Sequence, residues 1–184
     1  MSQASFKPAI TIRRVESREA GRLAALGARL FEETYREFTD PSDMASHLAG
    51  MYGEEIQRVE LADRDVITLF VEAAGDPIGY IQVRRRSTPE SVEHQADVEL
   101  RWFYLDTAYH GGGVAGPMMD AAEAAGRELG GGEMWLSVWT RNPRAIAFYV
   151  KRGFEEVGKS EFDVGEDRQT DLIMVTSLAN EPEP

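Results

Sequence analysis

The sequence predicts one α/β domain with a mixed central sheet of about seven strands and about four to five helices. Three observations predict it: the length of 184 residues suits one hydrophobic core, strand-like and helix-like apolar patterns both occur, and glycines or prolines separate them. Helices and strands do not alternate one by one, so a regular doubly wound sheet is not expected. We expect the domain at residues 9–179, between a flexible N-terminus (1–8) and a disordered tail (180–184).

The first part of the chain predicts a strand followed by helices. Residues 10–15 alternate in polarity and are rich in β-branched side chains, which is typical of a strand. Ser17 is the expected N-cap of the first helix, and two shorter helical segments are expected at 42–52, opened by Pro41, and at 54–61. The apolar face of the first helix is expected at positions with helical spacing: Leu23, Gly27, Leu30, Thr34 and Phe38.

Three strands are expected next. Residues 66–72 and 78–85 are separated by the turn Ala-Gly-Asp-Pro at 74–77, which indicates an antiparallel hairpin. A polar loop, 86–95, then precedes a third strand at 97–105 that is rich in aromatic side chains.

The remaining elements follow a cluster of glycines at 111–113, which leads into a helix with an apolar face. We expect that helix to run to about Leu129 and to be followed by a strand at 134–138. A further helix is expected from Asn142-Pro143 to about Lys151. Two last strands are expected at 154–162 and 171–177, around a turn at 165–167.

Composition excludes several kinds of site and partner. The 20 basic and 32 acidic residues leave a net charge of −12, which would repel nucleic acid and attract a cationic small molecule, although acidic surfaces also serve solubility alone. The chain has no cysteine, so disulfides, thiolate metal ligands and a cysteine nucleophile are excluded. Its three histidines, His47, His94 and His110, are scattered, so no metal site is expected.

No stretch is apolar over the roughly 20 residues that a membrane-spanning helix needs. Residues 1–8 carry no apolar segment of the kind found in signal peptides. We therefore expect a cytoplasmic protein that has no membrane partner.

The segment His110-Gly111-Gly112-Gly113-Val114-Ala115 lies between an expected strand and an expected helix. Glycines allow positive φ angles and close approach of a ligand, and the first amides of a helix favour phosphate. The lysine and hydroxyl residue of a P-loop are missing, and so is the GxGxxG order of a dinucleotide fold. From the glycines alone, a pyrophosphate site and a plain flexible turn remain equal alternatives.

Three segments, 98–106, 109–115 and 136–154, together resemble the GNAT acetyltransferase superfamily. In the family loop, (Gln/Arg)-x-x-Gly-x-(Gly/Ala), the two small positions are matched by Gly113 and Ala115. His110 stands where the family has Gln or Arg, and Pro117 removes a backbone donor near the helix start.

The resemblance implies that acetyl-CoA is the co-substrate. It implies that the backbone of Phe103, Tyr104 and Leu105 pairs with the pantetheine arm, and that an N–H near Phe103 contacts the thioester oxygen. Asn142 matches a position that contacts CoA, and a role as helix N-cap is compatible with that. The pyrophosphate would be held by the loop residues His110, Gly111, Gly112, Gly113, Val114 and Ala115.

Two residues match catalytic positions of the family. Tyr149 matches the tyrosine that protonates the departing CoA sulfur, and a phenol with a pKa near 10 carries its proton at neutral pH. The alternative for Tyr149 is a core side chain on an apolar helix face. Glu99 matches an acidic position that serves some members as general base, and the alternatives are bulk water as proton acceptor or a structural role.

Segments 31–35, 41–44, 135–142 and 164–174 resemble the bacterial PaiA group of polyamine N-acetyltransferases, which act on spermidine and spermine. The resemblance places the acceptor channel between the first helices and the last two strands, where opposed carboxylates could bind a polyamine. The substrate-binding candidates are Glu32, Glu33, Asp167 and Asp171, with Asp40, Asp43 and Glu166 nearby. Each of these could also be a solvated surface charge.

Two other functions remain open at this point. The acceptor could be a protein N-terminus or another small amine, and the domain could be an acyl-CoA-binding module without catalysis. The sequence does not fix the oligomeric state, and a homodimer is among the options.

Overall fold

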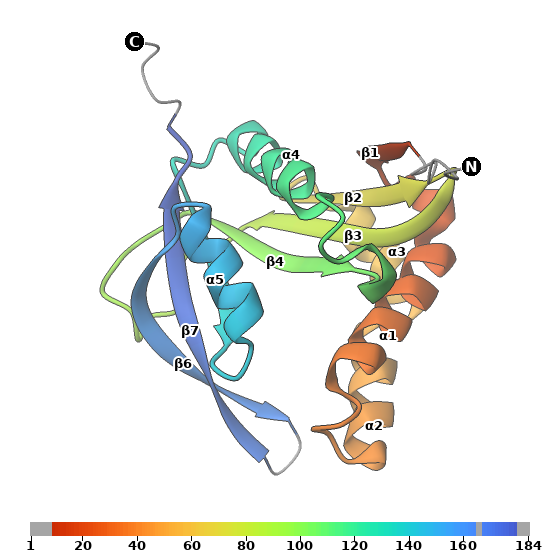
Figure 1. Ribbon diagram of the computed structural model, residues 1–184, viewed down its shortest axis with the longest axis horizontal. Helices are drawn as coiled ribbons and strands as arrows, with labels where there is room; N and C mark the ends of the chain where they lie inside the picture. The colour runs from red at the N-terminus through yellow and green to blue at the C-terminus, as the bar shows by residue number, and fades with distance from the viewer. Residues whose placement is uncertain (1–8, 165–166, 180–184) are drawn as a thin grey trace, which may run out of the picture.

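A seven-stranded sheet with helices on both faces organises the protein in the computed structural model, which describes residues 9–164 and 167–179 (Figure 1). The α/β class and the mixed sheet are therefore confirmed. The predicted flexible N-terminus (1–8) and tail (180–184) lie outside the described residues.

The sheet has the strand order β1-β2-β3-β4-β5-β7-β6. Its strands are β1 (Ile10–Arg14), β2 (Val66–Ala73), β3 (Asp76–Arg85), β4 (Val98–Leu105), β5 (Glu133–Trp139), β6 (Glu155–Val164) and β7 (Asp167–Ser177). Neighbouring strands are antiparallel except β4 and β5, which are parallel because α4 connects them as a crossover.

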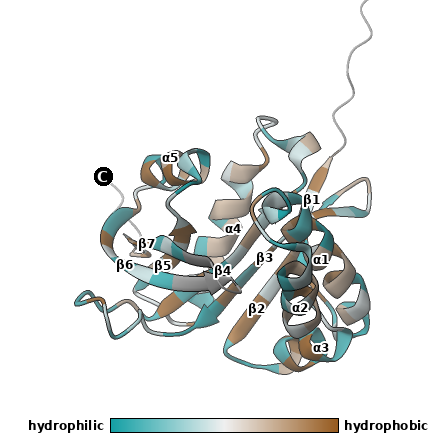
Figure 2. Ribbon diagram, turned by 90° about the horizontal axis from the view of Figure 1, so that it is seen from below, coloured by the Kyte–Doolittle hydropathy of each residue, from teal (hydrophilic) through white to brown (hydrophobic). Residues whose placement is uncertain are grey.

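The helices form two groups on opposite sides of the sheet, α1–α3 on one and α4 with α5 on the other (Figure 2). They are α1 (Ala20–Tyr35), α2 (Pro41–Met51), α3 (Glu54–Ala62), α4 (Ala115–Glu128) and α5 (Pro143–Lys151), with short 3-10 turns at Ser17–Glu19 and Thr107–Tyr109.

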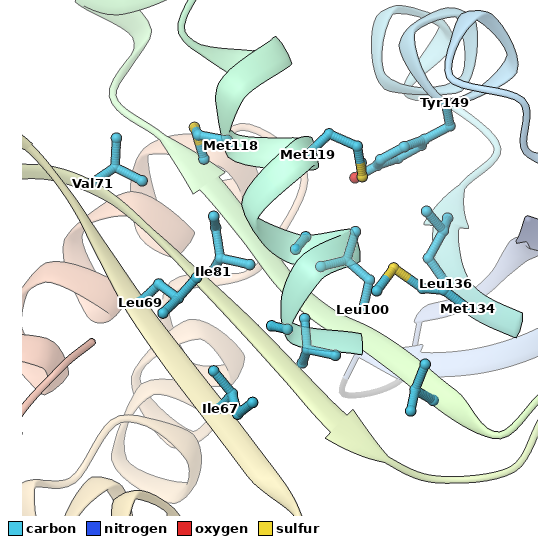
Figure 3. Packing of buried hydrophobic residues seen from close by; sticks show 14 of the residues in the cluster. Ile67, Leu69, Val71, Ile81, Leu100, Met118, Met119, Met134, Leu136 and Tyr149 are labelled. Carbon is cyan, nitrogen blue, oxygen red and sulfur yellow. The ribbon is translucent and has the colours of Figure 1, made fainter. Parts of the chain in front are cut away.

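Two apolar cores hold these layers together. Alternate residues of β2 enter different cores, because successive side chains of a strand point to opposite faces. Leu69 and Val71 pack with Met118 and Met119 of α4 (Figure 3), whereas Phe70 packs among α1 and α2 on the other face. The central strands are thus buried on both faces, which explains their nearly continuous apolar sequence.

The parallel pair β4 and β5 separates after two residue pairs. Val98 pairs with Met134 and Glu99 pairs with Trp135, and beyond these residues β4 and β5 no longer pair with each other. β4 nevertheless stays paired with β3 as far as Leu105, and β5 with β7 as far as Trp139. The sheet therefore opens into a wedge between β4 and β5.

A bulge in β4 lies where the wedge opens. Trp102 pairs with Gln82 while Leu100 pairs with Val83, so Arg101 is the extra residue between them. A bulge bends its strand and increases the local twist, which turns the end of β4 away from its parallel neighbour.

Several boundaries differ from the sequence prediction, including both ends of the first helix and the start of the last strand. Ser17 is the first residue of a 3-10 turn rather than a helix N-cap, and the Glu16 N–H donates to Glu19 Oε2 (3.0 Å) at this turn. α1 ends at Tyr35, so Phe38 is half exposed and contacts Trp139 edge-on instead of extending the apolar face. The last strand begins at residue 167 rather than 171. The sequence prediction missed this start because the first residues of the strand are polar and show no apolar alternation.

Candidate active site

The wedge between β4 and β5 opens into a cavity of about 1130 Å³. Its wall includes Gly111 and Gly113 of the glycine loop, Tyr149 of α5, Glu99 of β4 and Asp171 of β7. Residues of α1 and α2 close it from the other side, where the far ends of these helices lie opposite β6 and β7 (Figure 1). Residues predicted to bind the cofactor, to catalyse the reaction and to bind the acceptor therefore line the same cavity.

The glycine loop follows a 3-10 turn and ends at the first turn of α4. Gly111 (φ 73°) and Gly113 (φ 83°) adopt the left-handed conformation, which a side chain at either position would strain. Val114, the residue before the helix, makes no side-chain cap, so the first amides of α4 have no capping side chain. Such amides beside a cavity suit an anionic group.

His110 lies at the start of this loop and is exposed. Its Nε2 lies 2.9 Å from the Leu105 carbonyl oxygen, and its Nδ1 lies 2.9 Å from a terminal nitrogen of Arg144. Arg144 lines the same cavity from the first turn of α5 and was not among the residues singled out from the sequence.

Backbone groups of Phe103, Tyr104 and Leu105 form the β4 side of the wedge. These residues pair with β3 on one edge and have no strand partner on the edge that faces β5. All three line the cavity. The unpaired edge can accept an extended ligand chain as an added strand.

Asn142 caps α5. Its Oδ1 accepts a hydrogen bond from the Ala145 N–H (3.1 Å), and Pro143 occupies the first helical position, where its missing N–H costs nothing. The predicted N-cap role is therefore confirmed, and Asn142 also lines the cavity.

Tyr149 is 9% exposed and packs between aromatic rings. Its ring contacts Phe103, Phe148 and Phe154 at centroid distances of 6.3, 5.6 and 5.6 Å, and it extends toward Met119 of α4 (Figure 3). Burial raises the pKa of the Tyr149 phenol above its ordinary value, so the hydroxyl stays protonated at neutral pH. No described residue makes a hydrogen bond with this hydroxyl, and the group is free to serve a ligand in the cavity.

Glu99 is buried near the point where β4 and β5 separate. Its carboxylate forms an ion pair with the Arg84 Nε and lies 4.0 Å from the Nε of Arg86. The carboxylate is thus held by two arginines that the sequence prediction did not include. Arg84 belongs to β3, and only the pairing of β3 with β4 brings it beside Glu99.

The predicted acidic residues fall in different environments. Asp171 lines the cavity, is partly buried and accepts a hydrogen bond from the Ser137 hydroxyl (2.6 Å). Burial raises the pKa of Asp171, and no described cationic side chain lies within ion-pair distance of it. An unpaired carboxylate in a cavity wall attracts a cation.

Glu33 also lines the cavity and forms an ion pair with Arg29 (3.0 Å), whereas Glu32 does not line the cavity. Glu32 pairs with Arg36 (3.1 Å) along the exposed side of α1. Successive helical residues point about 100° apart, and Glu32 points toward Arg36 instead of the cavity. Asp40 accepts from the Ser42 N–H (2.8 Å) and caps α2.

Two of the acidic candidates cannot be placed. The side chain of Asp167 lies outside the described part of the structure, although the backbone of Asp167 starts β7. Glu166 lies wholly outside the described residues.

Aromatic side chains form much of the cavity wall. Tyr35 of α1, Trp102 and Tyr104 of β4, and Trp139 of β5 all line it, and of these four only Tyr104 was among the predicted site residues. His47 of α2 stacks on Phe31 with ring centroids 4.3 Å apart, and burial lowers the pKa of His47, which favours the neutral imidazole. These residues come from four separate elements, so no single local pattern indicates that they share one wall.

The described residues show neither a membrane-spanning helix nor a metal site. None of the helices in residues 9–164 and 167–179 is long and apolar enough to cross a membrane. Within the same residues, no group of three or more histidine, aspartate or glutamate side chains is arranged to hold a metal ion.

The sequence model of the acetyltransferase (GNAT) family matches residues 28–154, and the protein belongs to this family. It is similar to an uncharacterized N-acetyltransferase of Mycobacterium tuberculosis, with 31% identity over 160 residues that cover 87% of this chain and 98% of that protein. An uncharacterized N-acetyltransferase of Lactobacillus delbrueckii subsp. lactis is 26% identical over 169 residues, covering 92% and 98% of the two chains. The protein is thus an N-acetyltransferase of the GNAT family.

Solved structures share the fold. The PaiA N-acetyltransferase from Thermoplasma acidophilum, crystallised with coenzyme A, superimposes with a TM-score of 0.72 at 21% identity, covering 92% of this chain and 99% of that one. The spermidine/spermine N-acetyltransferase SpeG from Vibrio cholerae gives a TM-score of 0.64 at 17% identity, covering 92% and 94%. These likenesses establish the common architecture.

Proposed function

We propose that the protein transfers the acetyl group of acetyl-CoA to a primary amine, and that the acceptor is a polyamine such as spermidine or spermine. One observation carries the proposal: the glycine loop, the unpaired edge of β4 and Tyr149 line the same cavity. A diphosphate, a pantetheine arm and a thioester follow one another along CoA, and these three features suit them in that order.

The reaction is a direct transfer. The neutral amine nitrogen attacks the thioester carbon, and the oxygen that becomes negative is stabilised by a backbone N–H near Phe103. The C–S bond then breaks as the carbonyl forms again, and the Tyr149 hydroxyl gives its proton to the leaving sulfur. The nitrogen, which is positively charged after the attack, loses a proton to solvent and becomes the neutral amide, and a proton from solvent restores the phenol. The Tyr149 phenol is protonated at neutral pH before the sulfur leaves, as the role of an acid requires.

The amine must lose a proton before it attacks, because an amine with a pKa near 10 is almost wholly protonated at neutral pH. Glu99 is the proposed acceptor of this proton, directly or through water, since it is the carboxylate at the opening of the wedge. Its ion pair with Arg84 fixes the orientation of the carboxylate. Bulk water remains the competing acceptor.

Polyamine as the substrate class is supported by charge and by aromatic rings. Asp171 offers a carboxylate that has no ion-pair partner among the described residues, and Glu33 offers a second carboxylate, which is paired with Arg29. Tyr35 and Trp139 lie close to each other at a centroid distance of 6.1 Å in the same wall. Ammonium groups bind to carboxylates and to the faces of aromatic rings. The structural neighbour SpeG acts on spermidine and spermine.

An amine panel monitored by release of the CoA thiol tests the proposal. Acetyl-CoA is supplied in every reaction, and spermidine, spermine, a peptide with a free α-amine and an aminoglycoside are the acceptors. We expect turnover with the polyamines. Strong turnover of the peptide or the aminoglycoside with none of the polyamines would reject the polyamine acceptor while keeping acetyl transfer.

A further inference from the structure

The side chain of His110 is fully engaged by the protein itself. A carbonyl oxygen only accepts hydrogen bonds, so the Nε2 that faces the Leu105 oxygen (2.9 Å) carries the proton. A guanidinium only donates, so the Nδ1 that faces Arg144 (2.9 Å) is the acceptor. Both ring nitrogens are thus engaged by the protein, and the ring keeps no N–H for an anion.

Arg144 is a cation that this arrangement leaves available beside the glycine loop. Among the described residues, Lys151 also lines the cavity without an ion-pair partner, but it lies in the last turn of α5, away from the contact with His110. No described carboxylate lies within ion-pair distance of the Arg144 guanidinium, whereas Arg84 and Arg152, which line the same cavity, are both paired with carboxylates. One terminal nitrogen of Arg144 is bound to His110, and the other N–H groups of the guanidinium remain. An uncompensated guanidinium next to a glycine loop fits a phosphate group.

We propose that Arg144 is the side chain that binds the diphosphate of CoA, and that His110 is a positioning residue that holds Arg144 over the glycine loop. The inference rests on the proposed use of acetyl-CoA. It also accounts for the histidine at a loop position where Gln or Arg is usual. The imidazole of His110 links the end of β4 to α5, and Arg144 of α5 supplies the positive charge for the diphosphate.

Calorimetric titration of the whole protein with CoA, dephospho-CoA and pantetheine tests the role of Arg144. We expect Arg144→Gln to weaken CoA and dephospho-CoA by the same factor, about tenfold to a hundredfold, because both ligands carry the diphosphate. Pantetheine binding should not change, because pantetheine has no phosphate. Arg141→Gln is the matched control: Arg141 packs over Trp139, has no described carboxylate partner and does not line the cavity.

The role of His110 is tested by a double-variant cycle. His110→Ala should weaken CoA in the wild-type background and cause no further loss in the Arg144→Gln background, because it acts only through Arg144. Both residues are exposed, and thermal melts verify that the variants fold.

Each outcome separates the two proposals. Wild-type protein that binds no CoA rejects the proposed function itself. If Arg144→Gln binds CoA as tightly as wild type does, the proposed role of Arg144 is overturned and the proposed function stands. The same holds if the variant loses affinity for CoA but not for dephospho-CoA, because Arg144 would then contact the 3′-phosphate. Equal losses from His110→Ala in both backgrounds overturn the positioning role.

Discussion

At the scale of single residues, Tyr149 carries the chemistry of the proposed reaction. Removing its hydroxyl in Tyr149→Phe keeps the ring that packs against Phe103 and Phe154. We expect kcat to fall by about a hundredfold, which is within the usual range for loss of a general acid, while CoA affinity stays nearly unchanged. Steady-state kinetics and a CoA titration measure both quantities, and an unchanged kcat would show that Tyr149 is not the acid.

Asp171 is expected to serve binding at a cost to stability. A carboxyl whose pKa is raised in the folded state binds protons more tightly there than in the unfolded chain, so its ionisation removes stability as pH rises from about 4 through the raised pKa. Asp171→Asn should therefore keep or raise the melting temperature at pH 7 and raise KM for spermidine about tenfold.

The matched control for this variant is Asp76→Asn, because the Asp76 side chain is 89% exposed at the start of β3. It should change neither quantity. A normal KM for spermidine in Asp171→Asn would remove Asp171 from the acceptor site.

The residues that sequence analysis found share one property, which is that a short local pattern contains them. Gly113, Asn142 and Tyr149 each belong to a contiguous motif, and a motif specifies its own loop or helix turn. Arg84 and Arg144 were missed because their partners, Glu99 and His110, are 15 and 34 positions away in the chain. Only tertiary pairing brings such groups together.

At the scale of elements, the glycine loop depends on its backbone conformation. Gly113→Ala puts a side chain at φ 83°, where the strain costs about 1–2 kcal/mol, although no heavy atom lies within 4 Å of the added carbon. We expect the loop to shift and KM for acetyl-CoA to rise severalfold, with little change in kcat. Gly132→Ala, also in open space but without a positive φ, should leave KM unchanged, and equal behaviour of the two variants would contradict the role of the loop.

The start of the fold is held by a charged group between β1, the first 3-10 turn and β2. Arg13 donates to Glu19 (2.8 Å) and to Glu72 (2.7 Å), and the hydrogen bond from Arg13 lowers the pKa of Glu19 to about 2. A lowered carboxyl pKa contributes stability above the unfolded pKa of about 4.3, and this contribution is lost as pH falls toward 2.

Glu19→Gln should therefore lower the melting temperature at pH 7 by about 4 °C or more, and the difference from wild type should shrink toward pH 2. Thermal melts at several pH values measure it, with the exposed Glu93→Gln as control. A difference independent of pH would mean that Glu19 acts through packing rather than through its charge.

Among the elements, the helices and the buried central strands were predictable because their apolar periods are clear. The true start of the last strand was not, since β6 and β7 form a hairpin at the sheet edge with a polar sequence near its turn. The separation of β4 and β5 could not be predicted from the residues alone, because it depends on how two strands lie relative to each other.

At the scale of the whole molecule, the site exists because the sheet is incomplete at its centre. β3 pairs with the outer edge of β4 and β7 pairs with the outer edge of β5, so each strand beside the wedge is held in the sheet from its other side. The helices α4 and α5, which cover one face of the sheet, bring the glycine loop and Tyr149 to the same wedge. The net charge of −12 adds a long-range attraction for a cationic acceptor.

The most direct test of this account is a crystal structure of the protein with CoA. The account predicts the diphosphate over the amides of residues 111–115, the pantetheine arm along residues 103–105, and the sulfur beside the Tyr149 hydroxyl. The account would be contradicted if CoA were bound elsewhere. It would also be contradicted if crystals grown with saturating CoA showed no CoA in the wedge and the protein's own side chains filling it.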